Sequence, residues 1–371
     1  MHADRATRAT RLIVHLENLR YNIEAARKII GSRARICFSV KANAYGHGAV
    51  SISRCAVEAG VDYLGVATVS EGMELRDAGI SIPILLFSQA LPEEVPDIIM
   101  GELTPFISDG DFIEIMEREA ERLNKNLEVH LKIDTGMNRN GCHPEEAAFL
   151  AKKITSFKRL ILSGVATQLS VADSTEPEDM AYTKKQLGKF REALESIKNA
   201  GIDPGVTHAA NSGALVFHED SYFDMLRLGI FLYGYSPSTQ FLTKPVMEFR
   251  SKVVSIITVK KGDSVSYGRT WIADEDTIVG IIPVGYADGL PRLLSNNHTV
   301  SIGGKAYPIV GTICMDQCMV NLGLSTTVQR WDDVILFGPD HTSAEDIAKK
   351  LKTISYEITS GISKRVPRVY K

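Results

Sequence analysis

Two hydrophobic patterns alternate along the first two thirds of the chain. Over residues 16–30, apolar side chains recur at intervals of three and four residues, which predicts an amphipathic helix that ends at Gly31. The short apolar run at 36–40 is typical of a buried strand. The same alternation of short apolar runs and helical segments continues as far as residue 228.

Eight apolar runs predict the strands of this region, and helical segments separate most of them. The predicted strands are 36–40, 63–67, 84–87, 104–107, 127–133, 160–166, 206–209 and 225–228. The predicted helices between them include 52–59, 69–78, 111–123, 144–154 and 179–200. Eight strands that alternate with helices predict a parallel (β/α)₈ barrel, the TIM-barrel arrangement. An open doubly wound sheet is the alternative, because strand counts from one sequence are error-prone.

The pattern changes near Pro245, where helical periodicity stops. Turn signals separate the β-rich runs that follow, and a single late helix is predicted at 343–351. The predicted strands are 252–260, 277–284, 299–302, 306–313 and 333–337. We therefore expect a barrel over residues 12–245 and a mainly β domain over residues 246–371, with residues 1–11 associated with the β domain.

Composition adds constraints on partners and location. The 371 residues are 44% hydrophobic and 23% charged, which is ordinary for a globular protein with a large core. A formal net charge of −3 and the lack of a basic run argue against nucleic acid as a partner. No apolar stretch is long enough to span a bilayer, and the first residues contain no signal-peptide apolar segment. We expect a cytoplasmic protein with no membrane partner.

The cysteines agree with a reducing compartment. There are five, scattered along the chain, so a disulfide framework is not expected. Cys314 and Cys318 are the only close pair, and no second Cys/His cluster lies nearby. We interpret them as small core residues rather than metal ligands, and we expect no metal site.

Lys41 directly follows the first predicted barrel strand. Small residues, a tyrosine and two glycines come after it. Burial disfavours the charged form of a lysine, so one at the exit of a buried strand needs water or a chemical role. One such role is to hold an aldehyde cofactor as a Schiff base. The alternative is a structural lysine whose amine reaches solvent.

In a barrel of this kind, chemistry is located at the C-terminal ends of the strands. The loops after strands seven and eight usually bind phosphate, and here the N–H groups of Ser212, Gly229 and Ile230 are available to an anion. A lysine after strand one and an anion site at the same mouth suit pyridoxal phosphate. Ser212 also reads as a helix N-cap, and the alternative for Arg227 is a surface salt bridge. The strand-end rule selects Lys41, Lys132, Asp134, Arg139, Thr167, Gln168, His208, Ser212 and Arg227.

The segment Ser-Val-Lys-Ala-Asn-Ala-Tyr-Gly-His-Gly at 39–48 resembles the pyridoxal-phosphate attachment motif of bacterial alanine racemases. Further blocks resemble the family in its own order and span nearly the whole chain. They are LKIDTGMNR at 131–139, HAANS at 208–212, RLGIFLYG at 227–234, SYGRT at 266–270, GYADG at 285–289, ICMDQ at 313–317 and RVPR at 365–368.

The resemblance implies a pyridoxal-phosphate-dependent racemase that interconverts L- and D-alanine, for which D-alanine supply to peptidoglycan precursors is the expected role. It also implies a homodimer whose active sites are built from both subunits. Lys41 would hold the cofactor and act as one proton-transfer base, and Tyr267 of the partner subunit would be the other. Racemisation requires two bases on opposite faces of the α-carbon, one to remove the proton and one to return it.

The family also implies roles for other residues around the cofactor. Arg227 would face the pyridine nitrogen, supported by His208, and Arg139 with the backbone N–H of Met315 would bind the substrate carboxylate. Lys132 corresponds to a position that many members carry as a lysine carbamate. The phosphate-binding residues would be Tyr45, Ser212, Gly229 and Ile230.

Three departures from the family lie near the expected substrate path. Gln168 replaces a histidine, Lys364 replaces a tyrosine, and Thr312 replaces an arginine of the entrance corridor, to which Tyr286 also belongs. These changes affect the substrate more than the chemistry. Alanine is the default substrate, and a racemase for serine or for a basic amino acid is the alternative.

Two other functions compete with a racemase. A barrel-type amino-acid decarboxylase resembles the chain around Lys41, but the chain lacks the Cys-Asp-type motif that these enzymes usually carry, and Arg227 stands where they tend to place an acid. A cofactor carrier without turnover is the second. Single-domain carriers lack a β domain and its tyrosine, so Tyr267 argues against this alternative.

Overall fold

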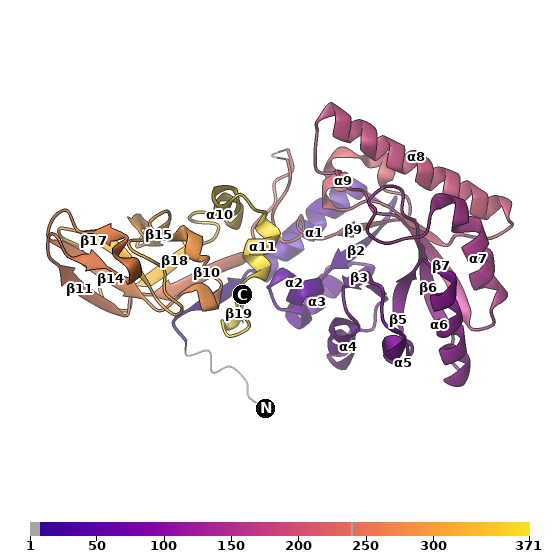
Figure 1. Cartoon of the computed structure of the whole chain (residues 1–371), viewed down its shortest axis with the longest axis horizontal. Coiled ribbons are helices and arrows are strands. Elements are labelled where there is room, and N and C mark those ends of the chain that lie inside the picture. Colours follow the sequence, from indigo (N-terminus) through magenta and orange to yellow (C-terminus); the bar gives the residue numbers. More distant parts are fainter. Residues whose placement is uncertain (1–7, 239) are drawn as a thin grey trace. The chain divides into compact units, whose positions relative to one another are not determined.

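The computed structural model describes residues 8–238 and 240–371. The chain divides into two compact units, which we describe separately (Figure 1). The barrel unit contains Leu19–Ala44 and Ala49–Thr243, and the β-rich unit contains the described residues 8–18 together with Tyr45–Gly48 and Lys244–Lys371. The boundaries that we expected at 12, 245 and 246 stay predictions. The expectation for residues 1–11 falls partly on residues 1–7, which lie outside the described residues.

Eight parallel strands form the barrel unit, in the order β8-β7-β6-β5-β4-β3-β2-β9. The first of them, β2, pairs with the last, β9, so the sheet curves back on itself. The (β/α)₈ barrel is therefore confirmed, and the open sheet is wrong. The strands are β2 (Arg35–Ser39), β3 (Tyr63–Val66), β4 (Ile84–Leu86), β5 (Leu103–Ile107), β6 (Leu127–Lys132), β7 (Leu160–Ala166), β8 (Val206–His208) and β9 (Met225–Leu228).

The regular ladder stops between β8 and β9, and single bonds join the two strands there. The N–H of Asp224 donates to the carbonyl of Thr207 at 2.9 Å, and the N–H of Arg227 donates to the carbonyl of Ala210 at 2.9 Å. In return, Oδ2 of Asp224 accepts the N–H of Thr207 at 2.8 Å and its hydroxyl at 2.5 Å. These bonds close the ring at its weakest point.

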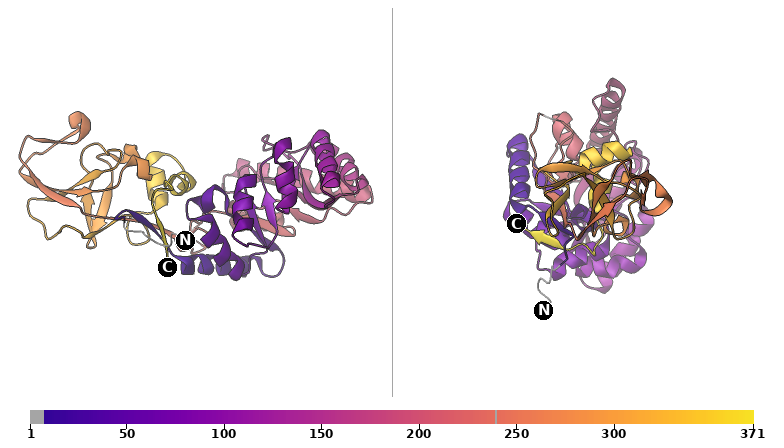
Figure 2. Two further views of the ribbon diagram at one scale, coloured as in Figure 1. Left: turned by 90° about the horizontal axis from the view of Figure 1, so that it is seen from below. Right: turned by 90° about the vertical axis from the view of Figure 1, so that its left-hand side faces the viewer.

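The helices of the barrel unit lie outside the ring of strands (Figures 1 and 2). The long amphipathic helices were predicted to within a few residues, and α1 was predicted to the residue. The six-residue helices α5 and α9 were missed, because they are too short to show a helical period. The helices are α1 (Leu16–Ile30), α3 (Ala49–Glu58), α4 (Val69–Asp77), α5 (Val95–Met100), α6 (Gly110–Arg122), α7 (Ala147–Ser156), α8 (Pro177–Asn199) and α9 (Ser212–Phe217).

Three sheets form the described part of the β-rich unit. The largest has the order β16-β15-β18-β10-β1-β19, a second has the order β11-β14-β17, and β12 pairs with β13. The six-stranded sheet consists of β1 (Arg11–Val14), β10 (Met247–Lys252), β15 (Thr299–Ile302), β16 (Lys305–Pro308), β18 (Asp333–Phe337) and β19 (Arg368–Tyr370). The smaller sheets consist of β11 (Ser255–Val259), β12 (Ser264–Val265), β13 (Trp271–Ile272), β14 (Thr277–Ile282) and β17 (Cys318–Gly323).

Several details of the β-rich unit differ from the expectation. The strand predicted at 306–313 ends at Pro308, and β17 was missed. The strand predicted at 252–260 corresponds to β11, which begins only at Ser255, whereas β10, which ends at Lys252 and belongs to another sheet, was missed. The helix predicted at 343–351 is confirmed as α10 (Ala344–Leu351), but a second helix, α11 (Ser355–Ser360), follows it. Within the described residues, no helix is long and apolar enough to cross a membrane.

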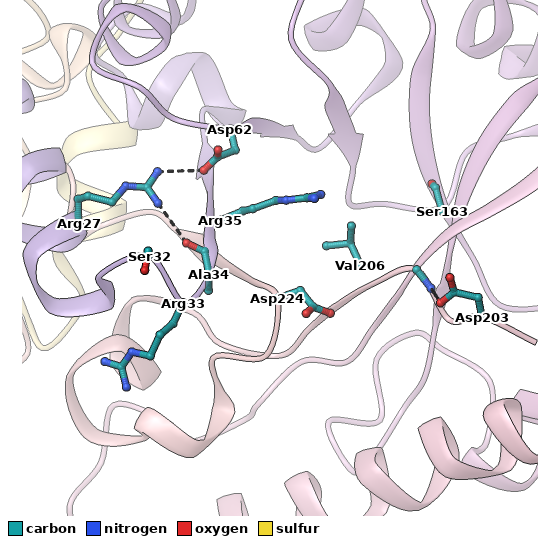
Figure 3. A pocket seen from close by; sticks show the side chains of 11 residues that line it. Arg27, Ser32, Arg33, Ala34, Arg35, Asp62, Ser163, Asp203, Val206 and Asp224 are labelled. Carbon is teal, nitrogen blue, oxygen red and sulfur yellow. Dashed lines mark hydrogen bonds and ion pairs between the residues drawn. The ribbon is translucent and has the colours of Figure 1, made fainter.

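A pocket of about 590 Å³ opens at the N-terminal ends of the barrel strands (Figure 3). Its charged groups are largely tied to the fold. Arg27 bonds to the Asp62 carboxylate at 2.9 Å and to the Ala34 carbonyl at 3.1 Å, and Asp224 is held by Thr207. This end of a (β/α)₈ barrel contributes to stability, whereas chemistry is located at the other end.

We expect Asp224→Ala to lower the free energy of unfolding by about 1–2 kcal/mol, because it removes two bonds that join β8 to β9. Urea unfolding of the variant and its parent measures the difference. Asp220→Ala is the control, because Asp220 forms an exposed ion pair with Arg191. The loss of such a pair lowers the free energy of unfolding by about 0.5 kcal/mol or less. Equal losses in the two variants would contradict a closing role for Asp224.

Candidate active site

The backbone after Lys41 takes a strained path. Lys41 lies two residues beyond β2, and the next four residues, 42–45, all have φ between 52° and 54°. This left-handed turn contains no glycine, so it costs roughly 1–2 kcal/mol per residue. Glu71 in α4 helps to hold it, because its Oε1 accepts the N–H of Ala42 at 2.6 Å. Strained backbone is concentrated at functional sites, which supports a functional role for Lys41.

The side chain of Lys41 is half-buried. Burial and the positive charge of Arg139 lower the pKa of its amine, and the carboxylate of Glu71 acts in the opposite direction. A lowered pKa leaves more of the amine neutral, and therefore nucleophilic, near neutral pH. Arg139 itself is exposed, in the loop that follows β6.

Arg227 in β9 is buried, and each of its described partners is a neutral acceptor. It donates to the carbonyl of Thr167 at 2.6 Å, to Oε1 of Gln168 at 3.0 Å and to the carbonyl of Ala209 at 3.1 Å. It also donates to Nδ1 of His208 at 2.6 Å and to the His208 carbonyl at 3.1 Å. The alternative of a surface salt bridge is wrong. Burial lowers the pKa of Arg227 to about 10, so the guanidinium stays charged at neutral pH.

Ser212 is the first residue of α9 and is buried. Its Oγ accepts the N–H of Gly229 at 2.9 Å, so its own hydroxyl proton is left to donate. The N-cap of α9 is Asn211, whose Oδ1 accepts the N–H of Ala214 at 3.0 Å. Interpreting Ser212 as the N-cap was therefore wrong by one residue. Ile230, beside Gly229, is buried as well.

Lys132 ends β6 and is only 4% exposed. Burial lowers the pKa of its amine to about 7, the charge of Arg227 adds to this, and Asp134 opposes it. The carboxylate of Asp134 is used elsewhere: its Oδ1 accepts three backbone N–H groups of the loop after β6, those of Gly136, Met137 and Asn138. Lys132 therefore has no carboxylate bond among the described residues.

The strand ends of the barrel carry an excess of positive charge. Four basic side chains lie there: Lys41, Lys132, Arg139 and Arg227. Glu71 and Asp134 are the carboxylates that act on Lys41 and Lys132, and both accept bonds from backbone N–H groups. Excess positive charge beside an amine of lowered pKa fits an anionic ligand that carries an aldehyde, which is the chemistry of pyridoxal phosphate.

Gln186 in α8 is a site residue that the sequence did not reveal. It is fully buried, its Oε1 accepts the N–H of Ser170 at 2.9 Å, and its Nε2 donates to the carbonyl of Gln168 at 3.1 Å and to Oγ1 of Thr135 at 3.4 Å. It thus fixes the loop that presents Gln168 to Arg227. The only signal was a polar residue on the apolar face of a predicted helix. His130 in β6 was also missed, and its only signal was a polar residue within a predicted apolar strand.

The remaining predicted residues lie in the β-rich unit. Tyr267, Tyr286 and Met315 line one pocket of about 540 Å³, and Tyr267 is 73% exposed. Thr312 fixes the backbone at Tyr267, because its hydroxyl donates to that carbonyl at 2.9 Å. Lys364 is exposed in the segment before β19.

Tyr45 is buried, and its ring packs at 5.5 Å from that of Tyr356. Cys318 is buried and Cys314 half-buried. Within the described residues, no group of three His, Cys, Asp or Glu side chains is placed to hold a metal ion.

The pKa of Lys132 makes stability depend on pH. Between its pKa of about 7 in the folded chain and the ordinary 10.5, the unfolded chain binds more protons, so stability rises with pH across this window. We expect Lys132→Met to be more stable than its parent at pH 7, by on the order of 3 kcal/mol, with a gap that narrows towards pH 10. Denaturation in bicarbonate-free buffer measures this. The exposed Lys184→Met should give a curve parallel to the parent, and a parallel curve for Lys132→Met would contradict the prediction.

Comparison with known proteins agrees with this geometry. Residues 14–237 match the family "Alanine racemase, N-terminal domain", and residues 246–370 match "Alanine racemase, C-terminal domain". The chain is 48% identical to the alanine racemase of Treponema denticola over 98% of each chain. It is 38% identical to that of Halothermothrix orenii over 99% of this chain and 98% of the relative.

Solved structures give the same result. An alanine racemase of Clostridium difficile superposes with a TM-score of 0.94 at 35% identity, over 98% of this chain and 96% of that one. The racemase of Bacillus anthracis with bound L-Ala-P gives a TM-score of 0.91 at 33% identity, over 98% and 95% of the two chains. The two domain matches, the near-complete coverage and the shared fold show that this chain belongs to the alanine racemase family.

Proposed function

We propose that the chain interconverts L- and D-alanine with pyridoxal phosphate as its cofactor. The observation that carries the proposal is the set of basic side chains at the strand ends around Lys41. The nearby carboxylates of Glu71 and Asp134 accept bonds from the backbone. Membership of the family supports the same activity. The expected setting is the cytoplasm, with D-alanine supplied to peptidoglycan precursors.

The barrel residues suit the separate parts of this cofactor. Lys41 would hold it covalently through its amine, and Ser212 would donate its free hydroxyl proton to the phosphate. Tyr45 and the N–H of Ile230 would add donors. The N–H of Gly229 now donates to Ser212, so it would have to exchange that acceptor to reach phosphate. Once bound, the cofactor withdraws electrons from the substrate α-carbon and lowers the cost of removing its proton.

Arg227 would donate to the pyridine nitrogen. Its guanidinium is held by neutral acceptors and stays charged, so it presents an N–H without transferring the proton. The electron withdrawal is then moderate, which favours return of the α-proton over side reactions. His208 would keep Arg227 in place through the 2.6 Å bond to its Nδ1.

We propose that the second base is Tyr267 of the partner subunit, in a homodimer with shared active sites. The support in this chain is that Tyr267 is highly exposed, that Thr312 fixes its backbone, and that it lines a pocket with Met315 and Tyr286. Lys41 and the partner's Tyr267 would then act on opposite faces of the α-carbon. Arg139 and the N–H of Met315 would hold the substrate carboxylate.

Two variants test the two-base arrangement. We expect Lys41→Ala to abolish racemisation and Tyr267→Phe to lower kcat by about 10²–10⁴-fold, the usual contribution of one acid–base group. A chiral assay with L- and with D-alanine measures both directions. The exposed Tyr21→Phe, in α1, is the control and should stay within about twofold of the parent. Full activity of Tyr267→Phe would overturn its assignment as a base.

Alanine labelling in heavy water separates the competing reactions. A racemase introduces solvent deuterium at the α-carbon without releasing carbon dioxide, a decarboxylase releases it, and a carrier does neither. The same assay on alanine, serine and lysine tests the substrate, with Gln168→His and Lys364→Tyr restoring the usual family residues. We expect alanine to be turned over fastest. A tenfold preference for serine or lysine would replace alanine as the substrate.

We also propose that Lys132 is carbamylated. Only a neutral amine reacts with carbon dioxide, and a pKa of about 7 leaves this lysine substantially neutral near physiological pH. The resulting anion would balance Arg139 and Arg227, whereas an ammonium would repel them. We expect intact mass spectrometry in bicarbonate to show the added mass of one carbon dioxide, absent from Lys132→Met. An unmodified parent in bicarbonate would refute this assignment.

A further inference from the structure

Three buried side chains in the barrel form a line of hydrogen bonds. One terminal nitrogen of Arg227 lies 2.6 Å from Nδ1 of His208, and Nε2 of His208 lies 2.8 Å from Nδ1 of His130. His208 is 0% exposed and His130 is 1% exposed. His130 belongs to β6. It bonds to Nε2 of His208, whereas Arg227 bonds to Nδ1 on the other side of the same ring.

The first donor sets the direction of every bond in the line. A guanidinium can only donate, so Nδ1 of His208 must accept, and the proton of a neutral His208 is then on Nε2. That N–H points to Nδ1 of His130, which accepts in turn. Burial and the charge of Arg227 lower the pKa of both rings, that of His130 to about 3, which agrees with two neutral histidines.

We infer that His130 is a positioning residue that fixes the tautomer and orientation of His208 and, through it, the aim of Arg227. Without an acceptor for its Nε2–H, His208 would keep a buried unsatisfied donor or move its proton to Nδ1. A proton on Nδ1 would face the N–H of Arg227, donor against donor, and push the guanidinium away. The consequence for catalysis rests on the proposed racemase function, whereas the tautomer does not.

The barrel is built to hold this ring. The pairing of β6 with β7 shifts its register between Val129 and His130, and this shift sets His130 opposite Gly164. A Cβ at Gly164 would lie 2.6 Å from Cε1 and Nε2 of the His130 ring. On another side, the ring of Phe106 stacks on it at 6.2 Å with an angle of 22°. A register shift in one strand and a glycine in the neighbouring strand can together set the orientation of one side chain in a sheet.

A matched pair of substitutions isolates the acceptor. His130→Asn places a carbonyl oxygen near the position of Nδ1, whereas His130→Leu has a similar shape without an acceptor. Nitrogen NMR of ¹⁵N-histidine-labelled chain, prepared without cofactor, reports which ring nitrogen of His208 carries the proton, with the signal assigned by its loss in His208→Asn. We expect the Nε2–H form in the parent and in His130→Asn, and its loss in His130→Leu.

Gly164→Ala, in β7, also tests whether the position of the His130 ring sets the tautomer of His208. It keeps His130 but displaces its ring, so we expect it to lose the Nε2–H form as well; this variant serves in place of His130→Leu should the latter not fold. If His208 kept the Nε2–H form in both variants, the inference would be overturned.

The loaded enzyme supplies the functional readout. We expect His130→Leu to lower kcat for alanine about tenfold, with a smaller change in KM, and to shift the absorption band of the bound cofactor, while His130→Asn restores both. His298→Leu is the control, because it removes another buried histidine, bonded to the Leu336 carbonyl at 3.1 Å, and should leave the band unchanged. If kcat and the absorption band changed equally in His130→Asn and His130→Leu, His130 would act only through packing, and the inference would be overturned. A parent without racemase activity would refute the proposed function and leave the tautomer result standing.

Discussion

The buried positive charge of Arg227 is the constraint around which this barrel is arranged. A guanidinium removed from water needs several acceptors, and here they are carbonyl groups at the ends of β7 and β8 together with two side chains. These bonds lie beside the interruption of the ladder between β8 and β9. The same arginine therefore stabilises the closure of the barrel and keeps an uncompensated charge at its mouth.

The positive excess follows from how the carboxylates are used. Glu71 bonds to the N–H groups of Ala42, Ala67 and Thr68, and Asp134 bonds to the loop after β6. Both carboxylates hold backbone that lies next to a basic side chain. Because their oxygens accept these N–H bonds, they have little capacity left to neutralise a basic side chain. The strained turn after Lys41 is one result, because Glu71 stabilises its first residue. Local backbone structure and the charge of the site thus depend on the same two side chains.

Much of the fold could be predicted from the sequence, because strands buried on both faces appear as short apolar runs. The residues at strand ends, such as Lys41 and Arg227, followed from the barrel rule once the strands were located. The start of β11 at Ser255 could not be predicted, because Val253 and Val254 directly precede it without a glycine or proline. His130 and Gln186 were missed for another reason: each bonds to groups that only the folded barrel brings near.

In the six-stranded sheet, β1 lies between two strands, β10 and β19, that both follow the barrel in the sequence. β1 pairs antiparallel with β10 and parallel with β19, the strand of this sheet that comes last in the sequence. During synthesis, every residue of the barrel is therefore joined before β1 can meet either partner. Domains generally fold as units in the order of their synthesis, so the barrel is able to form while the ribosome is still adding the second unit. The six-stranded sheet can be completed only once Arg368–Tyr370 have been made, because β19 supplies the second partner of β1.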